Sequence, residues 1–175
     1  MKAAEIIVGY SRTALGQKEK KNNGGFVSPW LEKKMIERGF KVGDPWCMLF
    51  AELILFETYI ETIHEKAINK LCSKSAVESW HNFSQDGTFP CNNIPAPGAV
   101  VIFQYYENGV KSWRGHAGIV VDVIGSGFFM CIEGNGNSQG GREGIEVVIR
   151  KRDTHHKPDN GLRILGFIHP ANIDI

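Results

Sequence analysis

The chain has 175 residues, 42% hydrophobic and 22% charged, which is the composition of a globular protein and excludes a disordered one. Its 20 Lys and Arg residues nearly balance 19 Asp and Glu residues, leaving a formal charge of +1. That balance does not fit the clustered basic surface of nucleic-acid-binding domains, so we expect no nucleic-acid partner. No segment reaches transmembrane length, and residues 1–16 lack the continuous apolar run of a signal peptide. We therefore expect a soluble monomer that folds as a single domain over residues 1–175, and its cellular location stays open.

The first half of the chain, to about Cys91, has the apolar spacing and the start and stop signals of helices. The second of these segments is the best delimited. Ser28 is placed to cap the helix, Pro29 suits its first position, and Gly39 is a stop signal. We expect helices over residues 3–16, 28–40, 44–60 and 73–83.

The third helix is apolar around most of its circumference, which is typical of a buried helix. Its start repeats the signals of the second, with Asp44 as the expected N-cap and Pro45 as the first helical residue. Cys47 then falls in the first helical turn, at the mouth of a long apolar segment.

The second half reads as short strands rich in Val, Ile and Phe and separated by Gly or Asn. The Gly125–Gly127 segment predicts a tight hairpin turn, and such short connections require antiparallel pairing. Helices followed by strands indicate an α+β fold, with the N-terminal helices packed on a C-terminal antiparallel sheet. The expected strands cover residues 98–106, 117–124, 127–133, 144–152 and 161–170.

The four cysteines show no C-x-x-C spacing, and the chain has no H-E-x-x-H motif, so we expect no metal site and no cofactor. Cys72 and Cys91 flank a polar loop and could form a disulfide in an oxidising compartment, although free thiols are favoured. The basic run at residues 150–157 is interpreted as a solvated loop. Residues 134–141, rich in Gly and Asn, are interpreted as a flexible loop rather than a phosphate-binding one.

A group of candidate catalytic residues emerges from this arrangement. His116 lies at the start of one expected strand, and Glu133 and Asn135 lie where its hairpin partner ends. The turn at Gly125–Gly127 falls roughly midway, so His116 and Glu133 should meet at one end of the sheet. Cys47 would be their nucleophilic partner.

This combination fits cysteine nucleophilic catalysis. A free thiol, with a pKa of about 8.5, is mostly protonated at neutral pH, and a helix N-terminus or an adjacent imidazole favours the reactive thiolate. A third group orients the imidazole, and Glu133 is the first candidate and Asn135 the second. Each residue also has an ordinary structural interpretation: a core thiol for Cys47, a surface or core histidine for His116, a turn carboxylate for Glu133. From the residues alone the two interpretations are balanced.

Several segments, in order, resemble the CHAP domain, the cysteine- and histidine-dependent amidohydrolase/peptidase family related to NlpC-type and papain-like cysteine peptidases. "GDPWCMLFAELI" resembles the family's nucleophile segment, and "GHAGIVVDV" resembles its histidine strand. "ALGQKEKKNNGG", "IPAPGAVVIF" and "IEGNGN" resemble the end of the first helix, a strand entry and a later strand end. Met48 and the Gly98–Ala99 pair depart from the usual residues at their positions, and the segment from Glu57 to Pro95 is longer than expected.

The resemblance implies a papain-like arrangement with Cys47 as nucleophile, His116 as general base, Glu133 as orienting group and Asn135 in the same network. It implies a peptidoglycan or muropeptide substrate, cut at the N-acetylmuramoyl-L-alanine amide or at a peptide bond, with the cell wall or periplasm as the site of action. Trp46, Trp113 and Tyr105 are candidate groove-wall aromatics, with a core role equally open for each. The alternatives are a cysteine amidohydrolase or acyltransferase acting on another amide, and a non-catalytic wall-binding module.

Overall fold

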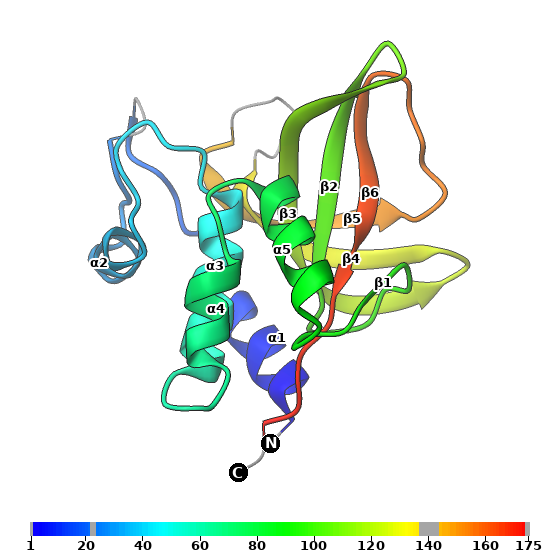
Figure 1. The fold of residues 1–175 in the computed structure, drawn as a ribbon. Coiled ribbons are helices and arrows are strands. Elements are labelled where there is room, and N and C mark those ends of the chain that lie inside the picture. Colours follow the sequence, from blue (N-terminus) through cyan, green and yellow to red (C-terminus); the bar gives the residue numbers. More distant parts are fainter. Residues whose placement is uncertain (1, 22–23, 137–143, 174–175) are drawn as a thin grey trace.

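The computed structural model describes residues 2–21, 24–136 and 144–173. In these residues, five helices are followed by a six-stranded antiparallel sheet (Figure 1). The expected α+β fold is therefore confirmed. The helices are α1 Ala3–Thr13, α2 Pro29–Glu37, α3 Cys47–Tyr59, α4 Glu65–Leu71 and α5 Ala76–Asp86. The strands are β1 Cys91–Asn92, β2 Val100–Glu107, β3 Val110–Gly125, β4 Phe128–Gly136, β5 Glu146–Asp153 and β6 Gly161–Ile168.

The strands are arranged in the order β1-β6-β2-β3-β4-β5, and every pair is antiparallel. β2, β3 and β4 are each paired with the next strand along the chain, as short connections require. β6 returns to the other side of β2, which places the C-terminal strand in the interior of the sheet.

The helices cover one face of the sheet, where α3 and α5 contact the central strands (Figure 1). Alternate residues of β2 and β3, such as Ile102 and Ala117, point into the main core beneath these helices. A smaller cluster lies on the opposite face: Ala99, Val101, Phe103, Val120, Phe129, Cys131 and Phe167. The sheet thus buries side chains on both of its faces.

The start and stop signals of α2 act as expected, and α5 has a similar serine cap. The Ser28 side chain accepts a hydrogen bond from the backbone N–H of Leu31, Pro29 is the first residue of α2, and Gly39 adopts a positive φ after its end. Ser75 caps α5 by accepting from the N–H of Glu78. α4 lies within the long segment between Glu57 and Pro95 and was not among the expected helices.

The predicted start of α3 was wrong by two residues, since Pro45 was the expected first helical residue. The helix begins at Cys47, and Trp46 occupies the N-cap position without a capping side chain. Asp44 instead accepts a hydrogen bond from the N–H of Lys41 and pairs with Lys74, which holds the preceding turn together. The expectation that α3 is buried is confirmed, since eleven of its thirteen residues are buried.

The predicted start of β3 was also wrong. β3 begins at Val110, six residues before His116, because Asn108 and Gly109 form a tight turn between β2 and β3. Both turn residues have positive φ, as a two-residue hairpin turn requires. The predicted hairpin turn between β3 and β4, through Ser126, is confirmed.

Three further expectations have mixed outcomes. Arg150, Lys151 and Arg152 belong to β5, as the strand expected over residues 144–152 predicts, so the interpretation as a solvated loop is wrong for this part of the basic run. β4 continues to Gly136, and the rest of the expected loop at residues 134–141 lies outside the described residues. The four cysteines are free thiols, so the structure shows no bond between Cys72 and Cys91. None of the helices described is both long and apolar enough to cross a membrane.

Candidate active site

Cys47 is the first residue of α3, and its side chain is directed at β3 rather than into the helical core. The imidazole of His116 and the backbone N–H groups of Ala117 and Met48 lie close enough to the sulfur to stabilise its thiolate form. The paired part of β3 and β4 ends at Ile119 and Ile132, which leaves the N–H of Ala117 available to the sulfur. Met48 supplies one of the N–H groups that a helix start leaves unpaired.

Glu133 completes a chain of side chains that begins at Cys47. Its Oε2 atom lies 2.9 Å from Nε2 of His116. Because Nε2 faces the carboxylate, Nδ1 is the ring nitrogen left for the thiol of Cys47. Both side chains are sheltered from water, with exposures of 15% for His116 and 1% for Glu133.

This arrangement favours a thiolate–imidazolium pair. Burial raises the pKa of the Cys47 thiol, but the charge of His116 and the hydrogen bonds to the sulfur outweigh burial and leave the pKa below its usual value. Burial likewise opposes protonation of His116, yet Cys47 and Glu133 together raise its pKa to about 10. The charged forms of the two groups stabilise each other, which is the condition that activates a cysteine nucleophile.

The position of α3 relative to β4 depends on close packing at Gly134. A Cβ atom added to Gly134 would lie 2.6 Å from Cζ3 of Trp46 and 2.7 Å from Cβ of Phe50. The missing side chain therefore lets the first turn of α3, with Cys47, approach the end of β4 next to Glu133.

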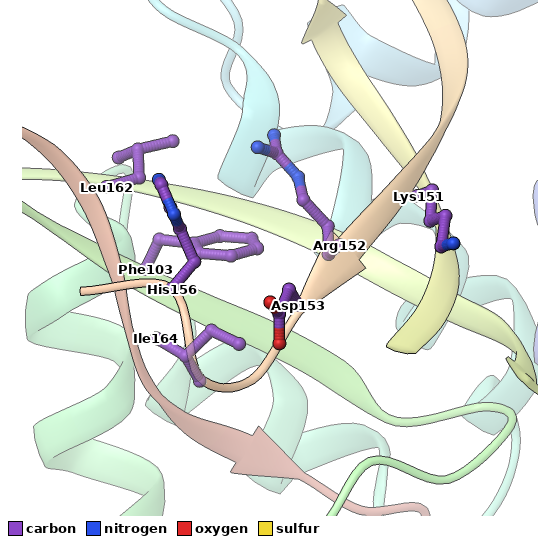
Figure 2. A pocket seen from close by; sticks show the side chains of 7 residues that line it. All are labelled: Phe103, Lys151, Arg152, Asp153, His156, Leu162 and Ile164. Atoms are coloured by element: carbon purple, nitrogen blue, oxygen red, sulfur yellow. The ribbon is translucent and has the colours of Figure 1, made fainter. Parts of the chain in front are cut away.

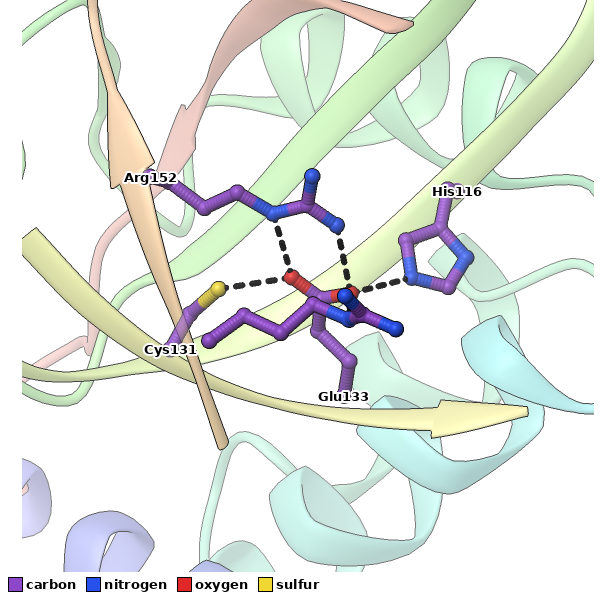
Figure 3. Close-up of polar contacts among 5 residues, drawn as sticks. His116, Cys131, Glu133 and Arg152 are labelled. Carbon is purple, nitrogen blue, oxygen red and sulfur yellow. Dashed lines mark hydrogen bonds and ion pairs between the residues drawn. The ribbon is translucent and has the colours of Figure 1, made fainter. Parts of the chain in front are cut away.

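Two residues that the sequence did not single out hold the Glu133 carboxylate. Arg152 on β5 donates from Nε to Oε1 and from Nη2 to Oε2, both at 2.7 Å (Figure 3). The Cys131 thiol donates to Oε1 at 2.8 Å. Arg150 lies farther away, with Nε 3.8 Å from Oε2.

These contacts explain how a carboxylate with 1% exposure stays ionised. Burial alone would raise the pKa of Glu133, but the hydrogen bonds and charges of His116 and Arg152 bring it far below the usual range. The Cys131 thiol shows the opposite effect: burial and the neighbouring Glu133 raise its pKa well above the ordinary value. Cys131 is therefore a neutral donor and not a second nucleophile.

Asn135 follows Glu133 by two residues on β4 but does not share its contact with the imidazole. It adopts a positive φ of 55° within an irregularity of the β4–β5 pairing between Glu133 and Gly136. Of the two candidates for orienting His116, Glu133 is the one whose carboxylate reaches the imidazole. In the described part of the chain, Asn135 shows no hydrogen bond to the imidazole.

The three candidate groove-wall aromatics have different environments. Trp46 is fully buried, packs edge-on against Phe26 and Phe50, and belongs to the core, so its role as a groove wall is corrected. Its indole N–H faces the carboxyl group of Glu19, although the contact is too long or bent for a good hydrogen bond. Trp113, with 82% exposure, projects from β3 into solvent. Tyr105 is half-buried beneath the guanidinium of Arg114.

A pocket of about 260 Å³ lies next to Arg152, on the face of the sheet that carries Phe103 (Figure 2). The guanidinium of Arg152 lies 5.0 Å from the centre of the Phe103 ring. The pocket is lined by Phe103, Lys151, Arg152, Asp153, His156, Leu162 and Ile164, and not by Cys47. Within the described residues, no group of three or more His, Cys, Asp or Glu side chains is arranged to hold a metal ion.

The sequence placed Arg152 both at the end of the strand expected over residues 144–152 and in the basic run, and it gave no role to Arg152 or Cys131. Alternation within the strand carries a usable signal for Cys131, because it precedes Glu133 by two residues and so shares its face. For Arg152 the signal would have been its position in the strand that follows β4. That β5 lies directly beside β4, with Glu133 paired with Val148, is known only from the structure.

As a chemical unit, the group combines a thiol with a lowered pKa, an imidazole that can accept and donate a proton, and a carboxylate in contact with that imidazole. These are the requirements of acyl transfer through a covalent thioester. The arrangement resembles the Ser-His-Asp triad in its roles, with a thiol in place of the hydroxyl group.

Comparisons with known proteins agree with this chemistry. The family model of the CHAP domain matches residues 39–135, which include Cys47, His116, Glu133 and Asn135. No curated protein and no solved structure matches the chain. Because the matched region covers more than half of the 175 residues, the chain belongs to the CHAP domain family, a family of amidase- and peptidase-type hydrolases.

Proposed function

We propose that this protein is a peptidoglycan hydrolase that cleaves an amide bond through a thioester on Cys47. In this proposal His116 is the general base and acid, and Glu133 orients it. The arrangement of a nucleophile helix against an antiparallel sheet is then papain-like, and the 175 residues act as one catalytic domain.

The observation that carries the proposal is the continuous contact from Cys47 through His116 to Glu133. The thiol interacts with the imidazole, and Nε2 of the same ring lies 2.9 Å from Glu133. Both ring nitrogens are thereby assigned, which fixes the orientation of the imidazole. A structural cysteine would require neither a charged partner nor two backbone donors at its sulfur.

In the proposed reaction, the Cys47 thiolate attacks the carbonyl carbon of the amide and forms a tetrahedral oxyanion. The backbone N–H of Cys47 at the start of α3 is the candidate donor to that oxygen. The intermediate collapses to a thioester as the C–N bond breaks, and protonated His116 gives its proton to the leaving amine. His116 then accepts a proton from water, which hydrolyses the thioester, releases the acid and restores the thiolate–imidazolium pair.

The candidate substrate surface lies beside Cys47 and His116. Trp113, three residues before His116 on β3, is exposed and provides a flat surface for a sugar ring or a peptide. Tyr105, held under Arg114, is the second candidate contact. Two bond types fit the proposal: the N-acetylmuramoyl-L-alanine amide and a peptide bond of the stem or cross-bridge.

Digestion of purified peptidoglycan, followed by mass analysis of the released fragments, tests the proposal. A new N-terminal L-alanine identifies an amidase, and any other new amine identifies an endopeptidase. Cys47→Ala should abolish release. If Cys47→Ala releases fragments as fast as the wild type, the proposal is wrong.

Two other outcomes would assign a different function to the same fold. Cleavage of a casein-type protein or a lipid amide, without release of muropeptides, would identify a cysteine amidohydrolase or acyltransferase acting outside the wall. Binding to peptidoglycan without cleavage, together with a Cys47 that does not react with iodoacetamide, would identify a non-catalytic wall-binding module.

A further inference from the structure

We propose that Arg152 is a positioning residue for the reaction: its two-point contact keeps Glu133 ionised and in the plane that orients His116. This inference rests on the proposed function, which assigns His116 and Glu133 their roles. Arg152 touches neither the nucleophile nor the imidazole, and it acts through Glu133.

The geometry shows a fixed carboxylate rather than a loose surface ion pair. Each oxygen of Glu133 accepts one hydrogen bond from Arg152 at 2.7 Å. A bidentate contact of this kind holds both the position and the plane of a carboxylate, which a lysine amine cannot do. Oε2 also faces Nε2 of His116, so the plane set by Arg152 is the plane that the imidazole meets.

Arg152 is itself held in place. Its guanidinium lies over the ring of Phe103, at 5.0 Å from the ring centre, and its side chain is 26% exposed. Phe103 is the cross-strand neighbour of His116, with the ring centres 6.1 Å apart. The same aromatic ring therefore lies next to both cations that flank Glu133 (Figure 2 shows Arg152 beside Phe103).

Several charged and polar groups face the Glu133 carboxylate, and Arg152 is one of them. β3 presents His116, β5 presents Arg152 and the more distant Arg150, and β4 itself presents the Cys131 thiol. On the far side of His116 lies Cys47 of α3. Arg152 makes the two shortest contacts from a cation to the carboxylate.

Removal of Arg152 has a specific consequence. A carboxylate with 1% exposure would lose one of the two counter-charges, His116 and Arg152, that keep its pKa low, so burial would favour its neutral form more strongly. A neutral Glu133 would no longer stabilise protonated His116, and the Cys47 thiolate would in turn lose its partner. The pH at which the Cys47 thiolate forms, seen as the acid limb of the alkylation rate against pH, should therefore be higher.

The experiment measures the rate of Cys47 alkylation by iodoacetamide against pH, followed by mass analysis of the Cys47 peptide. Wild type, Arg152→Gln and Arg152→Lys are compared, together with kcat and KM on solubilised peptidoglycan. For Arg152→Gln, we expect the midpoint of the acid limb of the alkylation rate to move to higher pH by at least one unit. At a fixed pH below that midpoint, the alkylation rate should then be roughly tenfold lower than in the wild type. Arg152→Lys keeps the charge and should keep the acid limb, but should lose about tenfold in kcat with KM unchanged because the two-point contact is gone.

Arg163→Gln is the matched control. Arg163 on β6 also stacks on an aromatic ring, that of Tyr106, and also pairs with a carboxylate, that of Asp159, but it does not contact Glu133. Its alkylation profile and kcat should equal those of the wild type.

Three results would overturn the inference. The first is a folded Arg152→Gln with the acid limb of the wild type, and the second is an equal shift in Arg163→Gln. If Arg152→Gln does not fold, an unchanged kcat in Arg152→Lys is the third. Alkylation uses no substrate, so its result is independent of whether peptidoglycan is the substrate, which the Cys47→Ala digestion tests.

Discussion

Glu133 occupies the space that a side chain on Gly118 would need: a Cβ atom added there would lie 2.8 Å from Cγ of Glu133. Gly118 is two residues after His116 on β3, on the strand that adjoins β4. The absence of a side chain at Gly118 thus lets Glu133 reach the imidazole across the strands. The active-site geometry depends on this space as much as on the three polar side chains.

Gly118→Ala should displace Glu133 from His116 while leaving the fold intact. Gly118 does not have a positive φ, so alanine fits its backbone, and the conflict is confined to Glu133 and the Ile132 carbonyl at 3.2 Å. We expect kcat to fall by about tenfold or more, which corresponds to about 1.4 kcal/mol of transition-state stabilisation. The measurement is kcat on solubilised peptidoglycan, with circular dichroism to verify folding. Full activity in a folded Gly118→Ala would contradict the claim that Glu133 needs the space beside Gly118 to reach His116.

The four thiols should differ strongly in reactivity. Cys47 has a lowered pKa, whereas burial raises the pKa of Cys91 to about 11 and those of Cys72 and Cys131 well above their ordinary value. At about pH 6, where an ordinary thiol of pKa about 8.5 is almost fully protonated, iodoacetamide should label Cys47 first. Peptide mass mapping after brief exposure measures this order. His116→Ala should abolish the selectivity, and preferential labelling of Cys91 in the wild type would argue against a thiolate at Cys47.

The free energy of unfolding should depend on pH through Glu133 and His116. The pKa of Glu133 is far lower in the folded protein than its usual value of about 4.3, so its stabilising contribution is complete above about pH 5 and is lost as the pH falls. The pKa of His116 is raised to about 10, so its contribution is complete below its usual pKa of about 6.5 and is lost as the pH rises towards 10.

Urea denaturation of the wild type and Glu133→Gln across this pH range tests the dependence. Near neutral pH, Glu133→Gln should be less stable by about 3–5 kcal/mol, the usual cost of removing one partner of a buried ion pair. The difference should shrink as the pH falls below about 4, because the wild type then loses the same charge interaction. A difference that stays constant from acid to neutral pH would show that the charge of Glu133 is not what stabilises the fold.

Gly134→Ala should damage the packing of α3 on β4. The added methyl group would lie 2.6 Å from Trp46 and 2.7 Å from Phe50, both fully buried side chains with little room to move. We expect a loss of about 1–3 kcal/mol in the free energy of unfolding, as is usual for overpacking, together with lower activity. Gly9→Ala in α1 is the control, since its added methyl group meets nothing within 4 Å and should stabilise the helix by about 0.5–1 kcal/mol.

Trp113→Ala should weaken substrate binding without affecting the catalytic group. The side chain is 82% exposed, so its removal costs little stability. Loss of a stacking surface worth about 0.5–1.5 kcal/mol predicts a KM higher by about two- to tenfold with kcat unchanged. Kinetics on solubilised peptidoglycan measure this change, and the rate of Cys47 alkylation should equal that of the wild type. An unchanged KM would remove Trp113 from the substrate surface.

The local parts of the fold were predictable because local interactions determine them. The Ser28 cap, the Pro29 start and the buried character of α3 follow from residues within a few positions of one another. The β3–β4 hairpin followed from its glycine-bounded turn, and the position of that turn roughly midway between His116 and Glu133 placed the two residues near each other. The start of α3 was placed two residues too early because the Asp44 side chain pairs with Lys74, a residue thirty positions away.

By itself, the sequence determined the α+β class and which residues could act together as nucleophile, base and orienting group, with Glu133 and Asn135 both open for the last role. The tertiary structure decided that Trp46 lies in the core and that Arg152 holds Glu133. A tryptophan or an arginine has the same local pattern in a solvated segment as in a packed one. Its role is set by which strand or helix lies beside it, and contacts between residues far apart in the chain determine that neighbour.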